Sequence, residues 1–389
     1  MSVTATATAT ATSAVEAASA SLIELSHYVH SHPELGYEEF ASSEAVAHAA
    51  EQAGFDVERG IASLPTAFRA TLGSGTLHIV FCAEYDALPD VGHACGHNII
   101  AASSLGAAIG LASVADELDL TVTLLGTPSE EGGGGKIDLI NAGCFDGVHA
   151  AMMIHPWPDD RLEATCLAVD HFDATFRGKD AHASAAPWEG INALDALTIS
   201  QVAIALLRQQ LRPGDQVHGI VAEGGSAANI VPSLAIGRYM ARSVSSERLG
   251  ELRGRIDACF RAGAVATGAR LQIEELGSAF SHMETDRDIL AHYRIAAEAL
   301  GRTFTLDDEG TPRPTISTDM ANVSLVVPSI HPLLGIPTNG AVNHQPEFTA
   351  ACITSDADRA VLDGALALAR TAIGVAQDPV LRSRLVARR

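Results

Sequence analysis

The sequence predicts an α/β protein in which a mainly parallel sheet is flanked by helices and a second domain is inserted into the first. Short apolar runs that suit strands buried on both faces alternate with helical segments early in the chain. Between residues 168 and 278 the pattern becomes strand, helix, strand, strand, helix, strand, the order of a ferredoxin-like βαββαβ unit. The first pattern then returns, so we expect residues 21–167 and 279–389 to form one discontinuous domain around the insertion.

The first 20 residues, in which threonine and alanine alternate, are expected to form a disordered tail. They contain neither a basic segment nor an apolar core of the kind that signal peptides have. The sequence also lacks a run of eighteen consecutive apolar residues, so we predict no membrane-spanning segment and no membrane partner.

The expected elements of the first domain follow a βαβαβ order, which favours a parallel sheet. Before the insertion they are helices at 16–30 and 41–54, a strand at 77–83, a helix at 100–118, a strand at 120–126, a short helix at 135–142 and a strand at 148–154. After the insertion they are a helix at 286–301, a strand at 324–330 and a long helix at 354–375. The insertion itself should contain strands at 171–178, 216–225, 234–243 and 270–276, with helices at 192–210 and 245–268.

Composition narrows the class of partner. The chain has 389 residues, and its formal net charge of −22 argues against nucleic acid or an anionic membrane surface. A small-molecule substrate is the expected partner. The six cysteines form no CxxC pair, and a chain of this size does not need a disulfide framework. This pattern favours a reducing, cytoplasmic location.

Chemically reactive residues follow three of the predicted strands. Asp86 and the motif GHACGHN at 92–98 come after the strand at 77–83, Glu130 and Glu131 after the strand at 120–126, and His155 after the strand at 148–154. Ligands of open α/β sheets bind beyond the carboxyl ends of the strands. Thiolate, imidazole and carboxylate groups are ligands that suit zinc and similar divalent ions.

Each of these motifs has other readings when taken alone. HACGH could be structural or redox-active, although a structural zinc site would need four local ligands and a redox pair would need a second nearby cysteine. The glycine run after Glu131 resembles a phosphate loop, but Ile137 stands where that loop has Ser or Thr. No GxSxG motif supports a serine hydrolase. Because neighbouring side chains on a strand point to opposite sides, one glutamate could bind metal while the other faces a water.

Seven motifs in order give the chain a specific resemblance that covers nearly everything after the first twenty residues. They are HPELGYEE (32–39), EYDALPDVGHACGHN (84–98), GTPSEEGGGGK (126–136), GKDAHAS (178–184), NIVP (229–232), STDMANVS (317–324) and NHQPEF (343–348). In this order they resemble the metal-dependent aminoacylase and carboxypeptidase family, peptidase family M20. The match is to its amidohydrolase branch, which includes p-aminobenzoyl-glutamate hydrolase and the β-alanyl-lysine dipeptidase.

The resemblance implies a zinc-peptidase-like catalytic domain with two divalent metal ions, zinc before manganese, cobalt or nickel. It also implies a homodimer formed through the inserted domain, which acts as a lid. The implied metal ligands are Cys95, His97, Glu131, His155 and His344. Glu130 is the implied general base, Asp86 orients a ligand, His182 acts on the metal site of the neighbouring subunit, and Asn229 and Arg242 hold the carboxylate of the substrate.

The implied reaction is hydrolysis of an amide bond by a metal-activated water. p-Aminobenzoyl-glutamate, a β-alanyl or other dipeptide and an N-acyl amino acid all remain possible substrates. A non-catalytic binding protein on a degenerate hydrolase fold is the alternative, but such a protein would be expected to have lost the base or a ligand, and all six positions are filled. The chain departs from many relatives at Asn98, where they have aspartate, and at Glu84-Tyr85, where Asp-Met is more usual.

Overall fold

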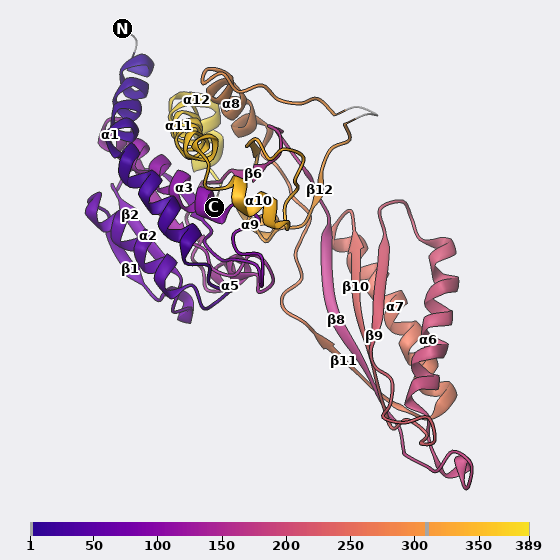
Figure 1. The fold of residues 1–389 in the computed structure, drawn as a ribbon. Helices are drawn as coiled ribbons and strands as arrows, with labels where there is room; N and C mark the ends of the chain where they lie inside the picture. The colour runs from indigo at the N-terminus through magenta and orange to yellow at the C-terminus, as the bar shows by residue number, and fades with distance from the viewer. Residues whose placement is uncertain (1–2, 308–310, 389) are drawn as a thin grey trace. The chain divides into compact units, whose positions relative to one another are not determined.

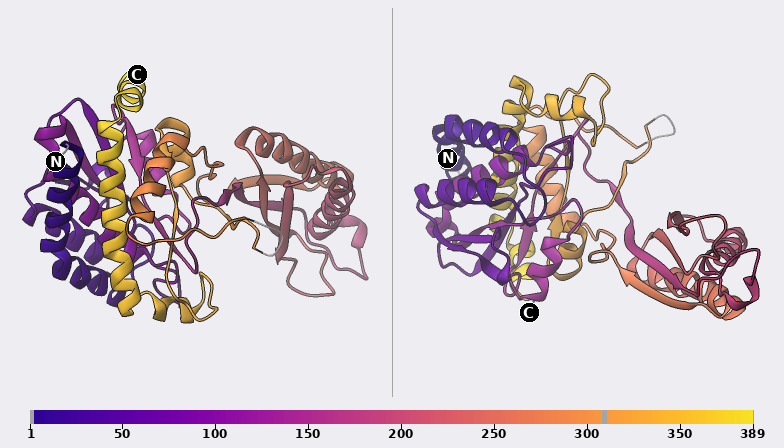
Figure 2. Two further views of the ribbon diagram at one scale, coloured as in Figure 1. Left: turned by 90° about the horizontal axis from the view of Figure 1, so that it is seen from above. Right: turned by 60° about the horizontal axis from the view of Figure 1, so that its bottom comes forward.

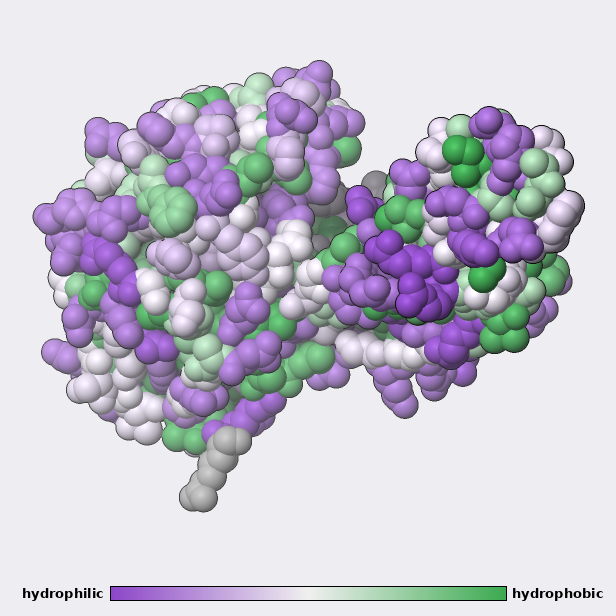
Figure 3. Space-filling model, turned by 90° about the horizontal axis from the view of Figure 1, so that it is seen from below, coloured by the Kyte–Doolittle hydropathy of each residue, from purple (hydrophilic) through white to green (hydrophobic). Residues whose placement is uncertain are grey.

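The computed structural model describes residues 3–307 and 311–388, which form two compact units. The chain passes from the first unit to the second at Thr165/Cys166 and returns at His282/Met283. Unit 1 therefore consists of the two outer segments of the chain, and unit 2 of the middle segment (Figure 1). On the face drawn in Figure 3, hydrophilic residues cover much of each unit, and hydrophobic residues are scattered in small groups among the hydrophilic ones.

Unit 1 is built on a six-stranded sheet with the order β1-β2-β4-β3-β5-β13. Its strands are β1 (Asp56–Arg59), β2 (Phe68–Leu72), β3 (Leu77–Ala83), β4 (Leu120–Gly126), β5 (Ala150–Met152) and β13 (Ser329–Ile330). The pairs β3–β4, β3–β5 and β5–β13 are parallel, whereas β1–β2 and β2–β4 are antiparallel. The predicted fold class, a mainly parallel sheet with flanking helices, is therefore confirmed.

The helices of unit 1 surround this sheet. They are α1 (Val3–Ser31), α2 (Phe40–Gln52), η1 (Ile61–Ser63), α3 (His97–Ala112), α4 (Ala115–Leu118), α5 (Gly135–Asn141), α8 (Arg287–Glu298), α9 (Met320–Val326), α10 (Pro346–Ala351), α11 (Ser355–Gln377) and α12 (Pro379–Val386). Short strands β6 (His155–Trp157) and β14 (Leu333–Gly335) pair in parallel, and β7 (Thr165–Cys166) and β12 (Thr315–Ile316) form a further small sheet.

The predicted disordered tail is wrong, because residues 3–31 form helix α1, which packs against α3 and α11. Ala7, Ala11 and Val15 are spaced by four residues, lie on one side of the helix, and are at most 1% exposed. Their small side chains allow the helices to approach closely. A Cβ atom on Gly110 of α3 would lie only 2.9 Å from Val15 Cγ2. Burial of this alanine-rich stripe therefore stabilises the helix, although the Thr-Ala alternation in the sequence does not indicate one.

The strand predicted at 324–330 is also largely wrong. Residues up to Val326 belong to helix α9, and only Ser329–Ile330 form a strand. The run of valines favoured a strand, but β-propensity depends strongly on context. Strands β1 and β2 had no counterpart in the predicted elements.

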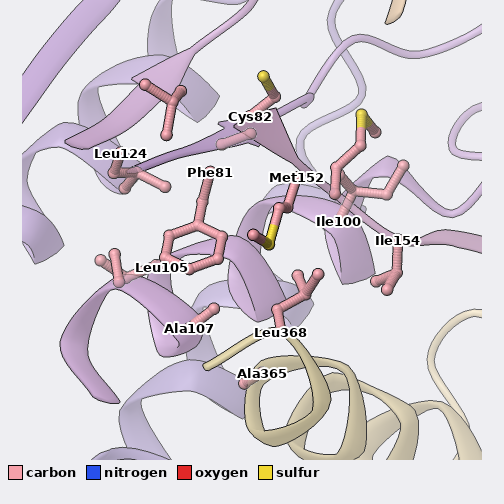
Figure 4. Close-up of a cluster of buried hydrophobic side chains, with 14 of the residues drawn as sticks. Phe81, Cys82, Ile100, Leu105, Ala107, Leu124, Met152, Ile154, Ala365 and Leu368 are labelled. Atoms are coloured by element: carbon pink, nitrogen blue, oxygen red, sulfur yellow. The ribbon is translucent and has the colours of Figure 1, made fainter. Parts of the chain in front are cut away.

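The core of unit 1 lies between the sheet and helices α3 and α11. Phe81 of β3, Leu105 of α3, Met152 of β5 and Leu368 of α11 meet there, and each is at most 2% exposed (Figure 4). Helix α11 is long and apolar enough to cross a membrane, but 67% of its most apolar window is buried in the protein. That burial is typical of a core helix.

Unit 2 has the predicted ferredoxin-like topology. Its elements are β8 (Ala168–Arg177), η2 (Pro187–Glu189), α6 (Ala193–Leu207), η3 (Arg208–Gln210), β9 (Gln216–Glu223), β10 (Leu234–Ser243), α7 (Ser246–Thr267) and β11 (Arg270–Glu275). The four strands form an antiparallel sheet in the order β11-β8-β10-β9, and α6 and α7 cover one of its faces (Figures 1 and 2). Phe172, Tyr239 and Phe260 form the centre of its separate core.

Candidate metal centre

Two predicted ligands, Cys95 and His97, are held at the start of α3, beyond the carboxyl end of β3. Gly96 between them has a φ of +73°, and a Cβ atom there would approach Pro156 Cγ to 2.8 Å. Only glycine accommodates both the left-handed backbone and the close contact. The sharp turn places both side chains in the interior, where Cys95 is 6% and His97 1% exposed.

The imidazole of His97 is oriented by Asp86. His97 Nδ1 lies 2.9 Å from Asp86 Oδ1, and the backbone N–H of Glu131 donates to Asp86 Oδ2 at 2.9 Å. Because a carboxylate only accepts hydrogen bonds, Nδ1 carries the proton in the neutral ring, and the lone pair then lies on Nε2. Burial lowers the pKa of this imidazole, but the carboxylates of Asp86, Glu84 and Glu131 outweigh burial and raise the pKa well above its ordinary value. His97 Nε2 is buried and has no hydrogen-bond partner. A carboxylate that orients a histidine in this way is typical of metal ligands.

The structure brings the five predicted ligands together in two groups that share Cys95. In each group the donor atoms lie within 4.8 Å of one another. The first group is fully buried, and the second includes the exposed His344. The two groups are Cys95, His97 and His155, and Cys95, Glu131 and His344.

His155 and His344 are positioned by backbone contacts. His155 Nδ1 lies 2.9 Å from the carbonyl oxygen of Pro156, so Nδ1 is the donor and Nε2 is free. His344 has a φ of +71°, and its backbone N–H donates to the carbonyl of Ala94, next to Cys95. Its side chain is 62% exposed, so this part of the site faces water.

Glu130 and Glu131 do not sit on a strand, as the argument for opposite side-chain directions assumed. β4 ends at Gly126, and the two glutamates lie in a turn that begins after Ser129, whose φ is +57°. Both carboxylates approach the same imidazole, and each has an oxygen 3.9 Å from His97 Nε2. The two residues are therefore neighbours around one ligand, and strand alternation does not separate their roles.

Residues that sequence reasoning did not single out complete the surroundings. Lys136, directly after the glycine run, is fully buried and donates from Nζ to Glu84 Oε1 at 2.5 Å and to Asp319 Oδ1 at 2.7 Å. Glu39 is buried and accepts from the backbone N–H of Ser129 at 2.8 Å, which fixes the turn before Glu130. The quoted motifs contained all of these residues. What the sequence did not reveal is that these charged side chains are buried.

Two further histidines are buried with both ring nitrogens unpartnered. His331 lies beside His155, with ring centroids 5.5 Å apart, and His93 lies 6.2 Å from His30. Neither belongs to the groups of converging metal-ligand atoms. Neither was predicted as a ligand. His331 is the one of the two whose ring lies beside the predicted ligand His155.

The unusual Asn98 has a structural reason in this chain. Its side-chain Nδ2 donates to Ser26 Oγ at 2.8 Å and to the carbonyl of Cys352 at 3.0 Å. A carboxylate cannot donate to a carbonyl oxygen, so aspartate could not make the second bond. Asn98 thus ties the start of α3 to α1 and to the residue that follows α10.

The charge balance of the site fits divalent cations. Glu84, Asp86, Glu130 and Asp319 are buried, Glu131 is nearly so, and Lys136 is the cation that contacts this group among the described residues. Burial and the nearby carboxylates raise the pKa of Glu130 well above its ordinary value. Uncompensated buried charges are costly, and thiolate, imidazole and carboxylate donors match divalent ions. The residues present therefore fit a metal centre.

The three remaining predicted site residues lie in unit 2. His182 and Asn229 are brought together, because Ala183 donates its backbone N–H to the Asn229 carbonyl at 3.0 Å. Arg242 lies near the other end of β10, paired with Val169 and Gln216. It lies eight positions after Leu234 along this extended strand, a distance of about 26 Å. Within one subunit the structure does not bring Arg242 together with His182 and Asn229.

Comparison with known proteins assigns the family. The family described as "Peptidase family M20/M25/M40" matches residues 80–372. The chain belongs to this family. It is 39% identical to the Xaa-Arg dipeptidase of Mus musculus over 94% of this chain and 88% of that protein. It is also 32% identical to a p-aminobenzoyl-glutamate hydrolase subunit of Escherichia coli over 67% of this chain and 57% of that protein.

Solved structures share the M20 fold. A putative aminohydrolase from methicillin-resistant Staphylococcus aureus has a TM-score of 0.78 at 19% identity, with 93% of this chain and 98% of that chain covered. A dinuclear metal-binding M20 peptidase from Bacillus subtilis has a TM-score of 0.71 at 22% identity, with 92% and 99% covered. The chain is accordingly an M20 hydrolase of amide or peptide bonds that uses divalent metal ions.

Proposed function

We propose that this M20 hydrolase cleaves the amide bond of a dipeptide or a dipeptide-like N-acyl amino acid at a centre of two divalent ions. The observation that carries the proposal is the pair of ligand groups that share Cys95, with Glu130 beside them. One thiolate common to two groups suits two neighbouring ions. Glu130, which lies in a further group with His97 and Glu131, is the carboxylate that we assign to proton transfer.

Ions at such a centre supply Lewis acidity and a nucleophilic water at neutral pH. The chain supplies the proton transfers. Glu130 accepts a proton from the attacking water and delivers it to the leaving amine nitrogen, as a general base and then a general acid. Asp86 orients His97 by accepting from Nδ1, so that the lone pair of the neutral ring lies on Nε2.

The tautomer of His182 supports its proposed role as a donor to the oxyanion. Its Nδ1 accepts from the backbone N–H groups of Ala185 at 3.1 Å and Ser184 at 3.3 Å. Nδ1 is therefore unprotonated in the neutral ring, and Nε2–H is the outward donor. Asn229 beside it and, from another part of unit 2, Arg242 are proposed contacts for the substrate carboxylate.

Among the possible substrates we favour a dipeptide with a basic C-terminal residue. The relatives from Mus musculus and Homo sapiens called Xaa-Arg dipeptidase are 39% and 37% identical over 94% of the chain. The net charge of −22 gives a cationic substrate a favourable field. p-Aminobenzoyl-glutamate, a β-alanyl dipeptide and N-acyl amino acids are the competing substrates for a release assay.

We further propose a homodimer that pairs through unit 2. β9 is an edge strand, and Ile220 on it is 63% exposed. On α6, which packs against β8 and β10 of the same unit, Val202 and Leu206 are 57% and 58% exposed. An edge strand and a helix of the same unit that both expose apolar side chains favour pairing with a second copy. Zinc as the native metal, suggested by the thiolate, and a cytoplasmic location remain predictions.

Two matched substitutions test the proposal. Glu130→Gln keeps size and hydrogen bonding but removes the base, so metal content should survive while turnover falls by roughly 10² to 10⁴. Glu131→Gln should lose metal first and activity as a consequence. Metal stoichiometry and turnover are measured on both variants with metal-reconstituted protein. Metal loss in Glu130→Gln with retention in Glu131→Gln would reverse the two roles, and full activity of a metal-loaded Glu130→Gln would exclude the mechanism.

A further inference from the structure

Glu130, the proposed base, lies between two backbone N–H groups that buried carboxylates hold. Ser129 donates its backbone N–H to Glu39 Oε1 at 2.8 Å, and Glu131 donates its backbone N–H to Asp86 Oδ2 at 2.9 Å. Glu39 is 0% and Asp86 1% exposed. A buried N–H without an acceptor is costly, so these two bonds fix the backbone on either side of Glu130.

The turn at Ser129 has a backbone conformation that needs this support. Ser129 has a φ of +57°, and Tyr37, in the segment that packs against the turn, has a φ of +65°. The contact is close, because a Cβ atom on Gly36 would overlap Ser129 Oγ. Left-handed backbone is uncommon for residues other than glycine and persists only where the surroundings fix it, often at active sites. Tyr37 donates its backbone N–H to Glu39 Oε1 at 2.9 Å, so the oxygen that accepts from Ser129 holds both strained residues.

Glu39 does not cap the helix at whose start it lies. It is the N-cap residue of α2, a position from which a side chain often accepts from the first turn, but it makes no side-chain capping hydrogen bond. Glu34 takes that role, because its two carboxylate oxygens accept from the backbone N–H groups of Ala41 at 2.9 Å and Ser42 at 2.8 Å. The second oxygen of Glu39 accepts from Thr66 Oγ1 at 2.8 Å. Helix capping therefore does not account for this buried glutamate.

We propose that Glu39 is a positioning residue, which sets the place of Glu130 by holding the backbone of the turn before it. This inference rests on the proposed function, in which Glu130 transfers the proton. Glu39 belongs to none of the groups of converging ligand atoms among the described residues. Its hydrogen bonds go to Ser129, Tyr37 and Thr66, so it acts on the base and not on the ions. A misplacement of about 1 Å caused by a residue away from the chemistry can cost about 100-fold in rate.

The test compares Glu39→Met, Glu39→Gln and Glu34→Met in the full-length, metal-reconstituted protein. Methionine has the length of glutamate but offers no oxygen to the two N–H groups, whereas the amide oxygen of glutamine can accept from both. The measurements are kcat per metal-loaded folded molecule, KM, metal stoichiometry and thermal stability. We expect kcat to fall about 10- to 100-fold in Glu39→Met, with KM and metal content unchanged, and Glu39→Gln to keep most of the turnover. Glu34→Met, which removes the cap of α2, should lower the thermal stability and leave kcat unchanged.

A double variant shows whether Glu39 acts through the base. Once Glu130→Gln has removed the base, Glu39→Met should cause little further loss, because the group that Glu39 positions is gone. If Glu39→Met does not fold, Glu39→Asp keeps a carboxylate but withdraws it from both N–H groups by about 1.5 Å, and the same cycle decides.

The outcomes separate the two proposals. The same fold loss from Glu39→Met with and without Glu130 would overturn the positioning role. So would a parental kcat in Glu39→Met, or a loss in Glu39→Gln as large as that in Glu39→Met. Full activity of a metal-loaded Glu130→Gln would instead refute the proposed mechanism itself.

Discussion

Replacement of Asp86 by asparagine should disable His97 as a ligand without removing any ligand. The amide has one acceptor and one donor where the carboxylate has two acceptors, and both oxygens of Asp86 are in use at 2.9 Å. If the amide oxygen stays on the Glu131 N–H, the NH₂ group faces His97 Nδ1. The proton of His97 then moves to Nε2, whose lone pair is no longer available for an ion.

The opposite orientation of the amide also carries a cost, because the buried N–H of Glu131 would lose its acceptor, at roughly 1 to 3 kcal/mol. Either way we expect metal affinity to fall about 10- to 100-fold, or about 1.4 to 2.7 kcal/mol. The assay is turnover as a function of free metal concentration, together with a metal-binding isotherm. Excess metal should restore most of the turnover of Asp86→Asn.

Asp138→Asn is the matched control, because Asp138 accepts a hydrogen bond from the Tyr37 hydroxyl at 2.7 Å and belongs to none of the ligand groups. Its metal affinity should equal that of the parent. A parental metal affinity in Asp86→Asn would refute the tautomer argument. So would a loss of turnover that no metal concentration reverses.

Four other predictions address the ligands, the assembly and the fold. Cys95→Ala should lose both ions yet stay soluble, since the thiol belongs to both ligand groups, and full metal content with normal turnover would contradict this. Mixing inactive His182→Ala with Cys95→Ala should restore part of the activity through hybrid dimers; no recovery despite verified subunit exchange would argue against action in trans. Burial raises the pKa of Glu39 to about 7 from 4.5, so its contribution is fully present below pH 4.5 and is lost as pH rises through 7. The free energy of unfolding of the parent should therefore fall by about 3 kcal/mol relative to Glu39→Gln across that range in urea titrations, and parallel pH profiles would refute it. Val15→Asp should destabilise the protein by at least about 3 kcal/mol in thermal unfolding, whereas the exposed Ala17→Asp should not, and equal effects would mean that α1 does not pack.

The parts of the fold that the sequence predicted well are those in which local pattern and burial agree. Strands β3 and β4 have the bounds that were expected, because both are short, mainly apolar segments that are followed by polar residues. The elements of unit 2 follow their predicted order for the same reason. Helix α1 was missed because its stability comes from contacts with α3 and α11, which lie far away in the sequence.

The candidate site was partly predictable for a related reason. The carboxyl ends of parallel strands meet at one edge, so Cys95, Glu131 and His155 could be expected to converge, and the structure places His155 in one group with Cys95 and Glu131 in another. Their roles stay predictions. Burial of Lys136 could not be inferred, because a lysine after four glycines is typical of an exposed loop. The argument that the side chains of Glu130 and Glu131 point to opposite sides assumed extended backbone, and it was wrong because the chain turns at Ser129.

The contact between α1 and α11 has a consequence for the order in which the chain folds. Leu22 and Ala365 both approach Gly106 of α3, where an added Cβ atom would lie within 2.8 Å of each side chain. During synthesis α3 can therefore pack against α11 only after all of unit 2 has been synthesised, because α11 follows unit 2 in the chain. Unit 2, which has its own core, can complete its sheet in that interval. The hydrogen bond of Asn98 to Cys352 ties the start of α3 to the same late segment, so a nascent chain cannot form this contact beside His97 until residue 352 has been synthesised.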